Sequence, residues 1–204
     1  MATDMSQDRS QPLPKESDWL LSFLDELKMT GTRLVEIGCG PGLDSAKLTA
    51  NGFEVVAFDV RALTRAKEIA RRAQLLRADL AQPFPFRDAA FDCALSSLAL
   101  HYHDWETTRA AFGEIRRVVK PASAFVFRVN AFDDEFHGAG QGEEIEPGFF
   151  LTPNVHYSET KRFFDEEMVR AAVEGLFEIQ HLAHTTIHRY ENPKRVFECL
   201  GRAI

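Results

Sequence analysis

The chain has 204 residues, of which 45% are hydrophobic and 27% are charged, and its formal net charge is −7. This length and apolar content fit one globular domain with a sizeable core. The acidic balance argues against nucleic-acid and anionic-membrane partners, since both favour a basic face. Three widely spaced cysteines, Cys39, Cys93 and Cys199, indicate reduced thiols in a cytoplasmic protein rather than disulfides or a zinc site.

The N-terminal stretch is polar and contains two prolines, so residues 1–15 are expected to form a flexible leader. No apolar run is long enough for a signal or a membrane span. From residue 16 to residue 204 we expect one domain. Apolar residues at helical spacing predict its first helix over 16–29.

Short apolar strands then alternate with helical segments. The predicted strands are 33–37, 53–59, 74–79, 91–97 and 123–130, and the helices between them are 43–52, 61–73 and 105–119. Such alternation predicts a parallel sheet with helices on both faces.

The alternation stops at residues 130–162, which are rich in glycine and charge and show no period. A loop of this length in a compact domain is commonly functional, so we expect a lid over the carboxyl edge of the sheet. A helix over 163–176 and two strands over 177–189 and 195–204 follow. With no helix between them, the two strands should pair antiparallel.

A glycine-rich loop, VEIGCGPG over residues 35–42, joins the first strand to a helix. A strand, such a turn and a helix form a cradle for anions and nucleotides. Dinucleotide sites use G-x-G-x-x-G, whereas here the pattern is G-x-G-x-G and Leu43 stands in place of the third glycine. The leucine disfavours a nicotinamide oxidoreductase.

Three carboxylates lie at the predicted carboxyl ends of successive strands, around one crevice. Asp59 can accept hydrogen bonds from ribose hydroxyls, whether of a nicotinamide or of a methyl donor. Glu36 would repel a pyrophosphate but could orient a cationic amino-acid cofactor, and Asp79 could accept a bond from an adenine amino group. The rim suits a sulfonium cofactor better than a diphosphate.

Five stretches, VEIGCGPG, AFDV, RADLAQPFPF, FDCALSSLALHYHDW and RRVVKP, occur in the order seen in class I S-adenosylmethionine-dependent methyltransferases. The chain resembles this family over about residues 33–130, in particular the small bacterial type 11 methyltransferases and, more loosely, the tellurite-resistance methyltransferases. The resemblance implies an α/β, Rossmann-like three-layer sandwich, with a seven-stranded, mostly parallel sheet and an antiparallel C-terminal strand pair. It also implies S-adenosyl-L-methionine as cofactor and S-adenosyl-L-homocysteine as product.

The resemblance assigns cofactor contacts position by position. Around the methionine moiety it places Glu36, Gly38, Cys39, Gly40, Gly42 and Ser96. Against the ribose and adenine it places Asp59, Val60, Asp79 and Leu80.

Methyl transfer from a sulfonium depends mostly on proximity and alignment, and needs a base only if the nucleophile carries a proton. His101, after the fourth strand, is the candidate base, with Tyr102 and His103 beside the acceptor; alternatively His101 packs against the cofactor or caps a helix. SSLA replaces the D/N-P-P-[YF] motif of amino methylation, and 204 residues leave little room for a macromolecule-binding domain. A small-molecule acceptor is therefore expected.

A possible anion-binding corner consists of Arg128, Asn130, Lys161 and Arg162. The acidic residues Glu143, Glu144 and Glu146 could instead neutralise these charges. No histidine, cysteine or carboxylate spacing predicts a metal site. A monomer or a homodimer is expected. The alternative function is a non-catalytic protein of the same fold that binds S-adenosylmethionine or S-adenosylhomocysteine, because fold alone does not imply activity.

Overall fold

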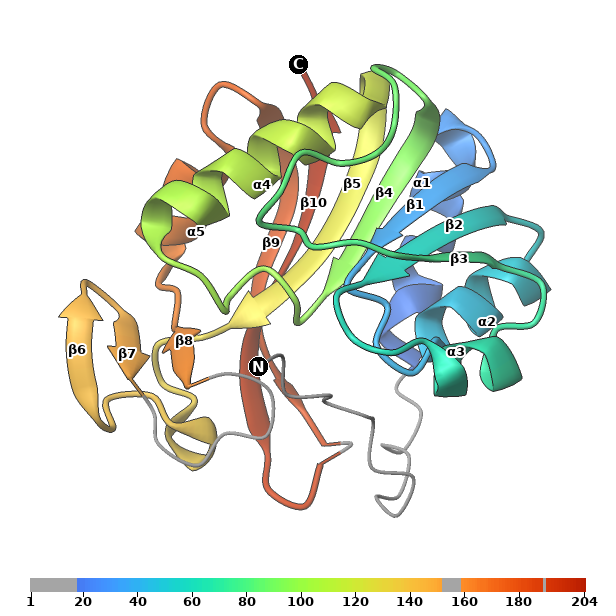
Figure 1. Ribbon diagram of the computed structural model, residues 1–204. Coiled ribbons are helices and arrows are strands. Elements are labelled where there is room, and N and C mark those ends of the chain that lie inside the picture. The colour runs from blue at the N-terminus through green and yellow to red at the C-terminus, as the bar shows by residue number, and fades with distance from the viewer. Residues whose placement is uncertain (1–17, 152–158, 189) are drawn as a thin grey trace.

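The computed structural model describes residues 18–151, 159–188 and 190–204, so the predicted leader lies outside the described residues. Seven strands form the main sheet (Figure 1). They are β1 (Arg33–Ile37), β2 (Glu54–Asp59), β3 (Gln74–Arg77), β4 (Phe91–Ser97), β5 (Val119–Asn130), β9 (Phe177–Ile187) and β10 (Lys194–Ala203). Their spatial order is β3-β2-β1-β4-β5-β10-β9.

The strand directions confirm the predicted fold class. Strands β1 to β5 pair in parallel, whereas β10 runs antiparallel to both β5 and β9. Helices connect β1 to β2, β2 to β3 and β4 to β5. The turn before β10 leaves no room for a helix, so that strand returns antiparallel. The order changes direction between β1 and β4, which places a ligand crevice at the carboxyl ends of these strands.

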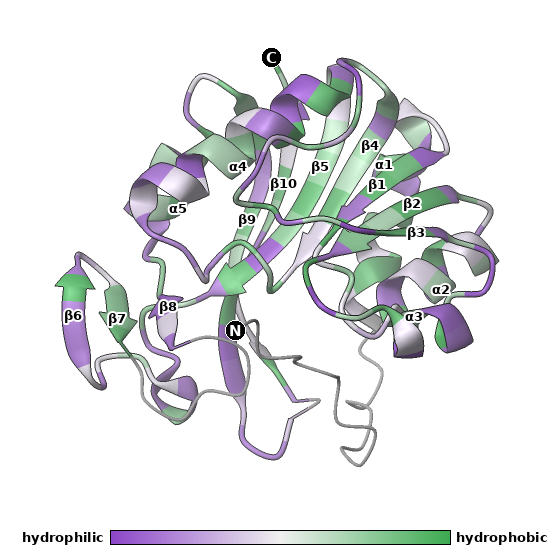
Figure 2. Cartoon of the chain, in the orientation of Figure 1, coloured by the Kyte–Doolittle hydropathy of each residue, from purple (hydrophilic) through white to green (hydrophobic). Residues whose placement is uncertain are grey.

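Helices cover both faces of the sheet, giving three layers (Figure 1). One face packs against η1 (Asp18–Phe23), α1 (Leu24–Thr30), α2 (Leu43–Ala50) and α3 (Thr64–Ile69). The other packs against α4 (Trp105–Val118) and α5 (Glu166–Val173). Side chains alternate along β1: Leu34 joins the first core and Val35 the second. Figure 2 shows the central strands as largely hydrophobic, and the outer face of α4 as polar.

The expectation that residues 130–162 lack regular structure is wrong. This segment contains η2 (Glu135–His137) and the strands β6 (Glu143–Glu146), β7 (Phe149–Leu151) and β8 (Thr160–Arg162), which form a separate antiparallel sheet. The strands are too short for a sequence period to reveal them. The small sheet lies beyond the carboxyl end of β5 (Figure 1). Its closure as a lid stays a prediction, and residues 152–158 lie outside the described residues.

Candidate functional site

The glycine loop is fixed to the end of β2 by its own backbone. The N–H groups of Gly38 and Cys39 both donate to the Phe58 carbonyl, at 2.8 and 3.0 Å. Gly38 has a φ of +71°, and a Cβ placed there would lie 2.2 Å from the Cβ of Ala99. Only glycine fits where the loop passes the segment after β4, because both the backbone conformation and the space exclude a side chain.

Gly42 allows α2 to begin against α3. A Cβ at Gly42 would lie 3.0 Å from the Cβ of Ala70 and 3.2 Å from the Cα of Ala66. Close helix packing is the role that the dinucleotide pattern gives to its third glycine. Gly42 allows a comparable close approach here, between α2 and α3, and Leu43 takes the next position, in the first turn of α2.

Glu36 lies in β1 beside the loop and is buried, with 2% of its surface exposed. Its Oε2 accepts a short hydrogen bond from the Ser45 hydroxyl in α2. Burial, then the nearby charge of Asp44, and finally that of Asp59 raise the pKa of Glu36 well above its ordinary value, against the effect of Ser45. A cation bound here would reverse that shift by stabilising the carboxylate.

Asp59, at the end of β2, holds both the loop and the following turn. Its Oδ2 accepts the Gly40 N–H at 2.9 Å, and its Oδ1 accepts the backbone N–H of Arg61 at 2.9 Å and the Arg61 Nε at 3.2 Å. Val60 beside it is 51% exposed, and so presents an apolar surface. A ribose reaching Asp59 would compete with Arg61 for Oδ1.

Asp79 and Leu80 follow β3. The Asp79 Oδ1 accepts the Ala81 N–H at 2.9 Å, which shapes the turn, and Leu80 packs partly buried against the core. Ser96 in β4 is fully buried and donates to the Ile37 carbonyl at 3.1 Å, so its hydroxyl is engaged within the sheet. The structure thus places Asp79 and Leu80 at the predicted edge, and Ser96 within the sheet.

Carboxyl groups predominate in the cradle. Glu36, Asp44 and Asp59 lie close enough to influence one another. Glu36 and Asp59 also raise the pKa of the buried Cys39 thiol, although burial is the larger cause and Arg61 opposes it. Three carboxylates around one guanidinium fit a cofactor with a sulfonium and an ammonium group, and would repel a diphosphate.

His101 lies after β4 and is buried, with 1% of its surface exposed. Its carbonyl accepts the Arg162 N–H at 2.7 Å, and its Nδ1 has no hydrogen-bond partner among the described residues. Burial, then Lys194, Lys161 and finally His103 lower the pKa of His101 well below its usual value. The imidazole is therefore neutral at pH 7, as a proton acceptor must be.

The two residues after His101 differ in their surroundings. The Tyr102 ring lies 4.3 Å from that of His101, and its carbonyl accepts the Thr160 hydroxyl at 3.2 Å. His103 is only partly buried, and burial lowers its pKa while the charges of Asp79 and Asp104 oppose the shift. The backbone of residues 101–103 is thus hydrogen-bonded to β8, and His103 lies close enough to Asp79 to be affected by its charge.

Arg128 and Asn130 are both buried near the carboxyl end of β5. Arg128 donates to the Ser97 hydroxyl at 2.7 and 3.2 Å, lies 3.7 Å from the Glu198 carboxylate and stacks 3.8 Å from the Trp19 ring centroid. Arg128 is therefore held by the protein itself. The Asn130 amide group has no hydrogen-bond partner for either of its atoms among the residues described.

Lys161 and Arg162 are neighbours in β8 and their side chains separate. Arg162 forms an ion pair with Glu146 and donates to the Pro147 carbonyl at 2.9 Å, so a glutamate neutralises it, as the alternative interpretation held. The Lys161 Nζ donates to the His137 carbonyl at 3.0 Å, and its charge lowers the pKa of His101. The predicted anion-binding corner is not one cluster: Lys161 belongs with His101, and Arg162 supports the small sheet.

A sequence profile described as a methyltransferase domain matches residues 35–127, which hold the glycine loop and the three strand-end carboxylates. The chain belongs to the class I S-adenosylmethionine-dependent methyltransferases. Malonyl-[acyl-carrier protein] O-methyltransferase of Enterobacter lignolyticus is 30% identical over 150 residues, 71% of this chain and 53% of that protein. The chain thus spans about half the length of this curated relative.

Solved structures of methyltransferases share the fold. An S-adenosylmethionine-dependent methyltransferase from Methanosarcina mazei has a TM-score of 0.73 at 19% identity, covering 89% of this chain and 97% of that one. The 1,6-didemethyltoxoflavin-N1-methyltransferase of Burkholderia thailandensis, solved with bound S-adenosylhomocysteine, has a TM-score of 0.64 at 19% identity, with 89% and 76% coverage. At these identities the likeness concerns the fold alone.

Sequence reasoning missed several residues that shape this candidate site. They are Ser45, Arg61, Asp134, His137 and Lys194. One signal was available: Asp134 lies shortly after the fifth strand, and Asp59 lies at the end of the second. Within the described ranges no group of histidines, cysteines and carboxylates could hold a metal ion, and no helix there is long and apolar enough to cross a membrane.

Proposed function

We propose that this chain transfers a methyl group from S-adenosylmethionine to a small-molecule acceptor by in-line displacement. The observation that carries the proposal is the pair of carboxyl groups, Glu36 and Asp59, at the glycine loop, where a bound cation would stabilise the ionised form of Glu36. The cradle matches the cationic cofactor of the family, and the acceptor side of the same edge holds the buried His101.

The cofactor supplies the methyl group as part of a good leaving group. Asp59 would hold the ribose and Asp79 the adenine edge, while Glu36 would orient the ammonium of the methionine moiety. His101 is neutral, and would accept a proton where the attacking group carries one. Burial around His101 excludes water from the attacking group. The O-methyltransferase relatives make oxygen the atom to test before nitrogen or carbon.

The test is calorimetric titration with S-adenosylmethionine, S-adenosylhomocysteine and NAD, followed by transfer of labelled methyl to candidate acceptors. We expect both sulfur ligands to bind and NAD not to bind. Asp59→Ala should weaken binding by about 1–3 kcal/mol, as for hydrogen bonds to a charged group. Asp25→Ala, at an exposed position in α1, is the matched control and should leave binding unchanged.

His101→Ala separates the chemical step from binding. If the imidazole is the base, turnover falls while cofactor affinity is kept. A folded protein that binds neither sulfur ligand would refute the proposal. Binding of both ligands without turnover on any acceptor would instead support the non-catalytic alternative.

A further inference from the structure

One ammonium group beside the candidate active site is buried, and it has no counter-ion among the described residues. Lys161 is 7% exposed, and its Nζ donates at 3.0 Å to a neutral group, the His137 carbonyl. Among the described residues no carboxylate lies within ion-pair distance of this nitrogen. A buried charge is costly unless it is paired, so a neighbouring anion would remove a penalty that the protein now bears.

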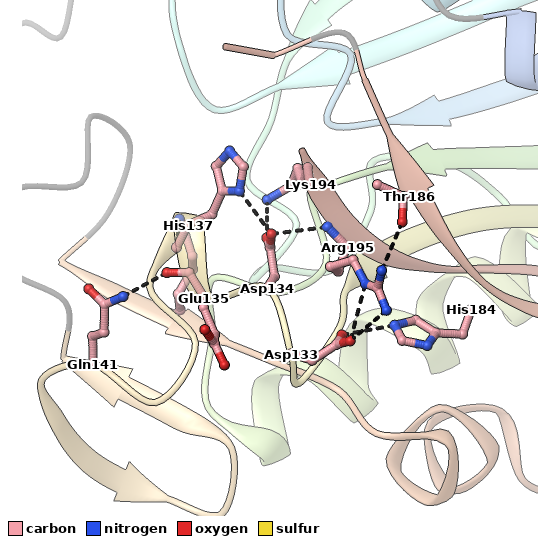
Figure 3. A network of polar contacts seen from close by, with 10 residues as sticks. Asp133, Asp134, Glu135, His137, Gln141, His184, Thr186, Lys194 and Arg195 are labelled. Carbon is pink, nitrogen blue, oxygen red and sulfur yellow. Dashed lines mark hydrogen bonds and ion pairs between the residues drawn. The ribbon is translucent and has the colours of Figure 1, made fainter. Parts of the chain in front are cut away.

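The buried carboxylate whose charge acts on Lys161 already has three hydrogen-bond donors. Asp134 accepts the Lys194 Nζ at 2.7 Å, the His137 Nδ1 at 2.8 Å and the backbone N–H of Arg195 at 3.0 Å (Figure 3). Asp134 therefore neutralises Lys194 and fixes the loop whose carbonyl receives Lys161. Asp134 is thus the counter-ion of Lys194, and the two ammonium groups leave a surplus of one positive charge among the described residues.

Neutral polar groups without partners lie around the same place. Asn130 pairs with Val196 in β10, and paired residues on neighbouring strands project to the same face, as does Lys194 two residues earlier. The Asn130 amide is fully buried, and neither of its polar atoms has a partner among the described residues. The Nδ1 of His101 is buried and also has no hydrogen-bond partner among the described residues. The charges of Lys194 and Lys161 both lower the pKa of this imidazole.

Orphaned buried polar groups are rare in native proteins, and each one calls for an explanation. Here Asn130 and His101 lie with the ammonium group of Lys161 at the carboxyl edge of the sheet, on the acceptor side of the cradle. A ligand that brings one negative charge and hydrogen-bond acceptors would satisfy the group as a whole. A phosphate dianion exceeds the surplus charge, and a neutral acceptor leaves it uncompensated.

We propose that the acceptor carries a carboxylate, that Lys161 is its counter-ion, and that His101 and Asn130 donate hydrogen bonds to it. This inference rests on the proposed methyl transfer, and it names the chemical class of the acceptor. The bound carboxylate orients the molecule against the methyl group. Burial, then the charge of Lys194, lower the pKa of Lys161 to about 8, while the charge of Asp134 opposes the shift. A bound anion would raise this pKa again by stabilising the ammonium form.

The test follows the imidazole resonances of histidine-labelled protein saturated with S-adenosylhomocysteine. The probes are acetate, malonate and succinate, each compared with its uncharged amide. At least one acid should shift the His101 resonance saturably, with a dissociation constant on the order of millimolar or tighter. The amides should produce no shift.

Two variants with the same chemical change provide the control. Lys161→Gln should weaken the response at least tenfold, whereas Lys120→Gln should keep it, since the Lys120 side chain is 54% exposed and lies at the amino end of β5. No saturable shift with any acid, equal shifts with the amides, or an unchanged response in Lys161→Gln would each overturn the inference. Failure to bind S-adenosylhomocysteine would refute the proposed function itself. Failure of the carboxylate inference and failure of the proposed function are therefore distinguishable.

Discussion

Gly38→Ala tests whether the glycine loop needs its close contact with the segment after β4. A Cβ at this position would lie 2.2 Å from the Cβ of Ala99, on a backbone with a φ of +71°. The left-handed conformation costs a residue with a side chain about 1–2 kcal/mol. Forcing a methyl group into a filled space costs about 1–3 kcal/mol more. The free energy of unfolding should therefore fall by about 2–5 kcal/mol in total.

Gly52→Ala is the matched control. Gly52 has a φ of +91°, and nothing lies within 4 Å of the position that a Cβ would take. This variant should lose only the conformational part, about 1–2 kcal/mol, in urea unfolding. The double variant Gly38→Ala/Ala99→Gly should recover the packing part, because the two methyl groups no longer overlap. Equal losses in the two single variants, or no recovery in the double variant, would refute the reasoning.

Three further variants probe the charges. Arg61→Ala should tighten S-adenosylmethionine binding about two- to fivefold by calorimetry, since it releases Asp59 from a partly exposed ion pair worth up to about 1 kcal/mol; weaker binding would contradict this. Asp134→Asn should cost about 3–5 kcal/mol at neutral pH, because it breaks a buried pair. Burial raises the pKa of Asp134, but hydrogen bonds from His137 and its lysine partner lower it overall, so its stabilisation is present above about pH 4 and is lost as the pH falls through the folded pKa. Unfolding curves at falling pH should show that loss in the wild type and not in the variant. Lys161→Met should stabilise the unliganded protein by on the order of 1–3 kcal/mol at neutral pH. The folded pKa of about 8 lies below the unfolded value, so the penalty is full below that pH and fades as the pH rises toward the unfolded value. Unfolding at pH 7 and near pH 10 checks the sign, and a gain that persists at high pH would refute it.

The strand-end carboxylates could be located from the sequence because the fold makes their position local. Glu36 and Asp59 lie at or beside the ends of apolar runs that read clearly as strands, and parallel strands bring such ends to one edge. Their partners were not predictable in the same way. The hydroxyl of Ser45 reaches Glu36 only because α2 begins at a particular angle to β1.

On the acceptor side, by contrast, the sequence predicted few of the contacts that the structure shows. Lys161 and Arg162 are adjacent in the chain, and the sequence gives no ground for separating them. The structure does so because alternate side chains of β8 project to opposite faces, one to Glu146 and the other to the His137 carbonyl. Likewise Asp134 and Lys194 are 60 residues apart, and meet only because β10 pairs with β5.

The sequence by itself determined the fold class, the order of the strands and helices that build the main sheet, the glycine loop and the carboxylates at the ends of the parallel strands. These features depend on period, turn chemistry and position relative to one strand, all of which are local. Only the tertiary structure decided which cations are neutralised and which polar groups stay without partners. Those outcomes depend on contacts between distant segments, and on burial, which turns an ordinary lysine such as Lys161 into a group that needs an anion.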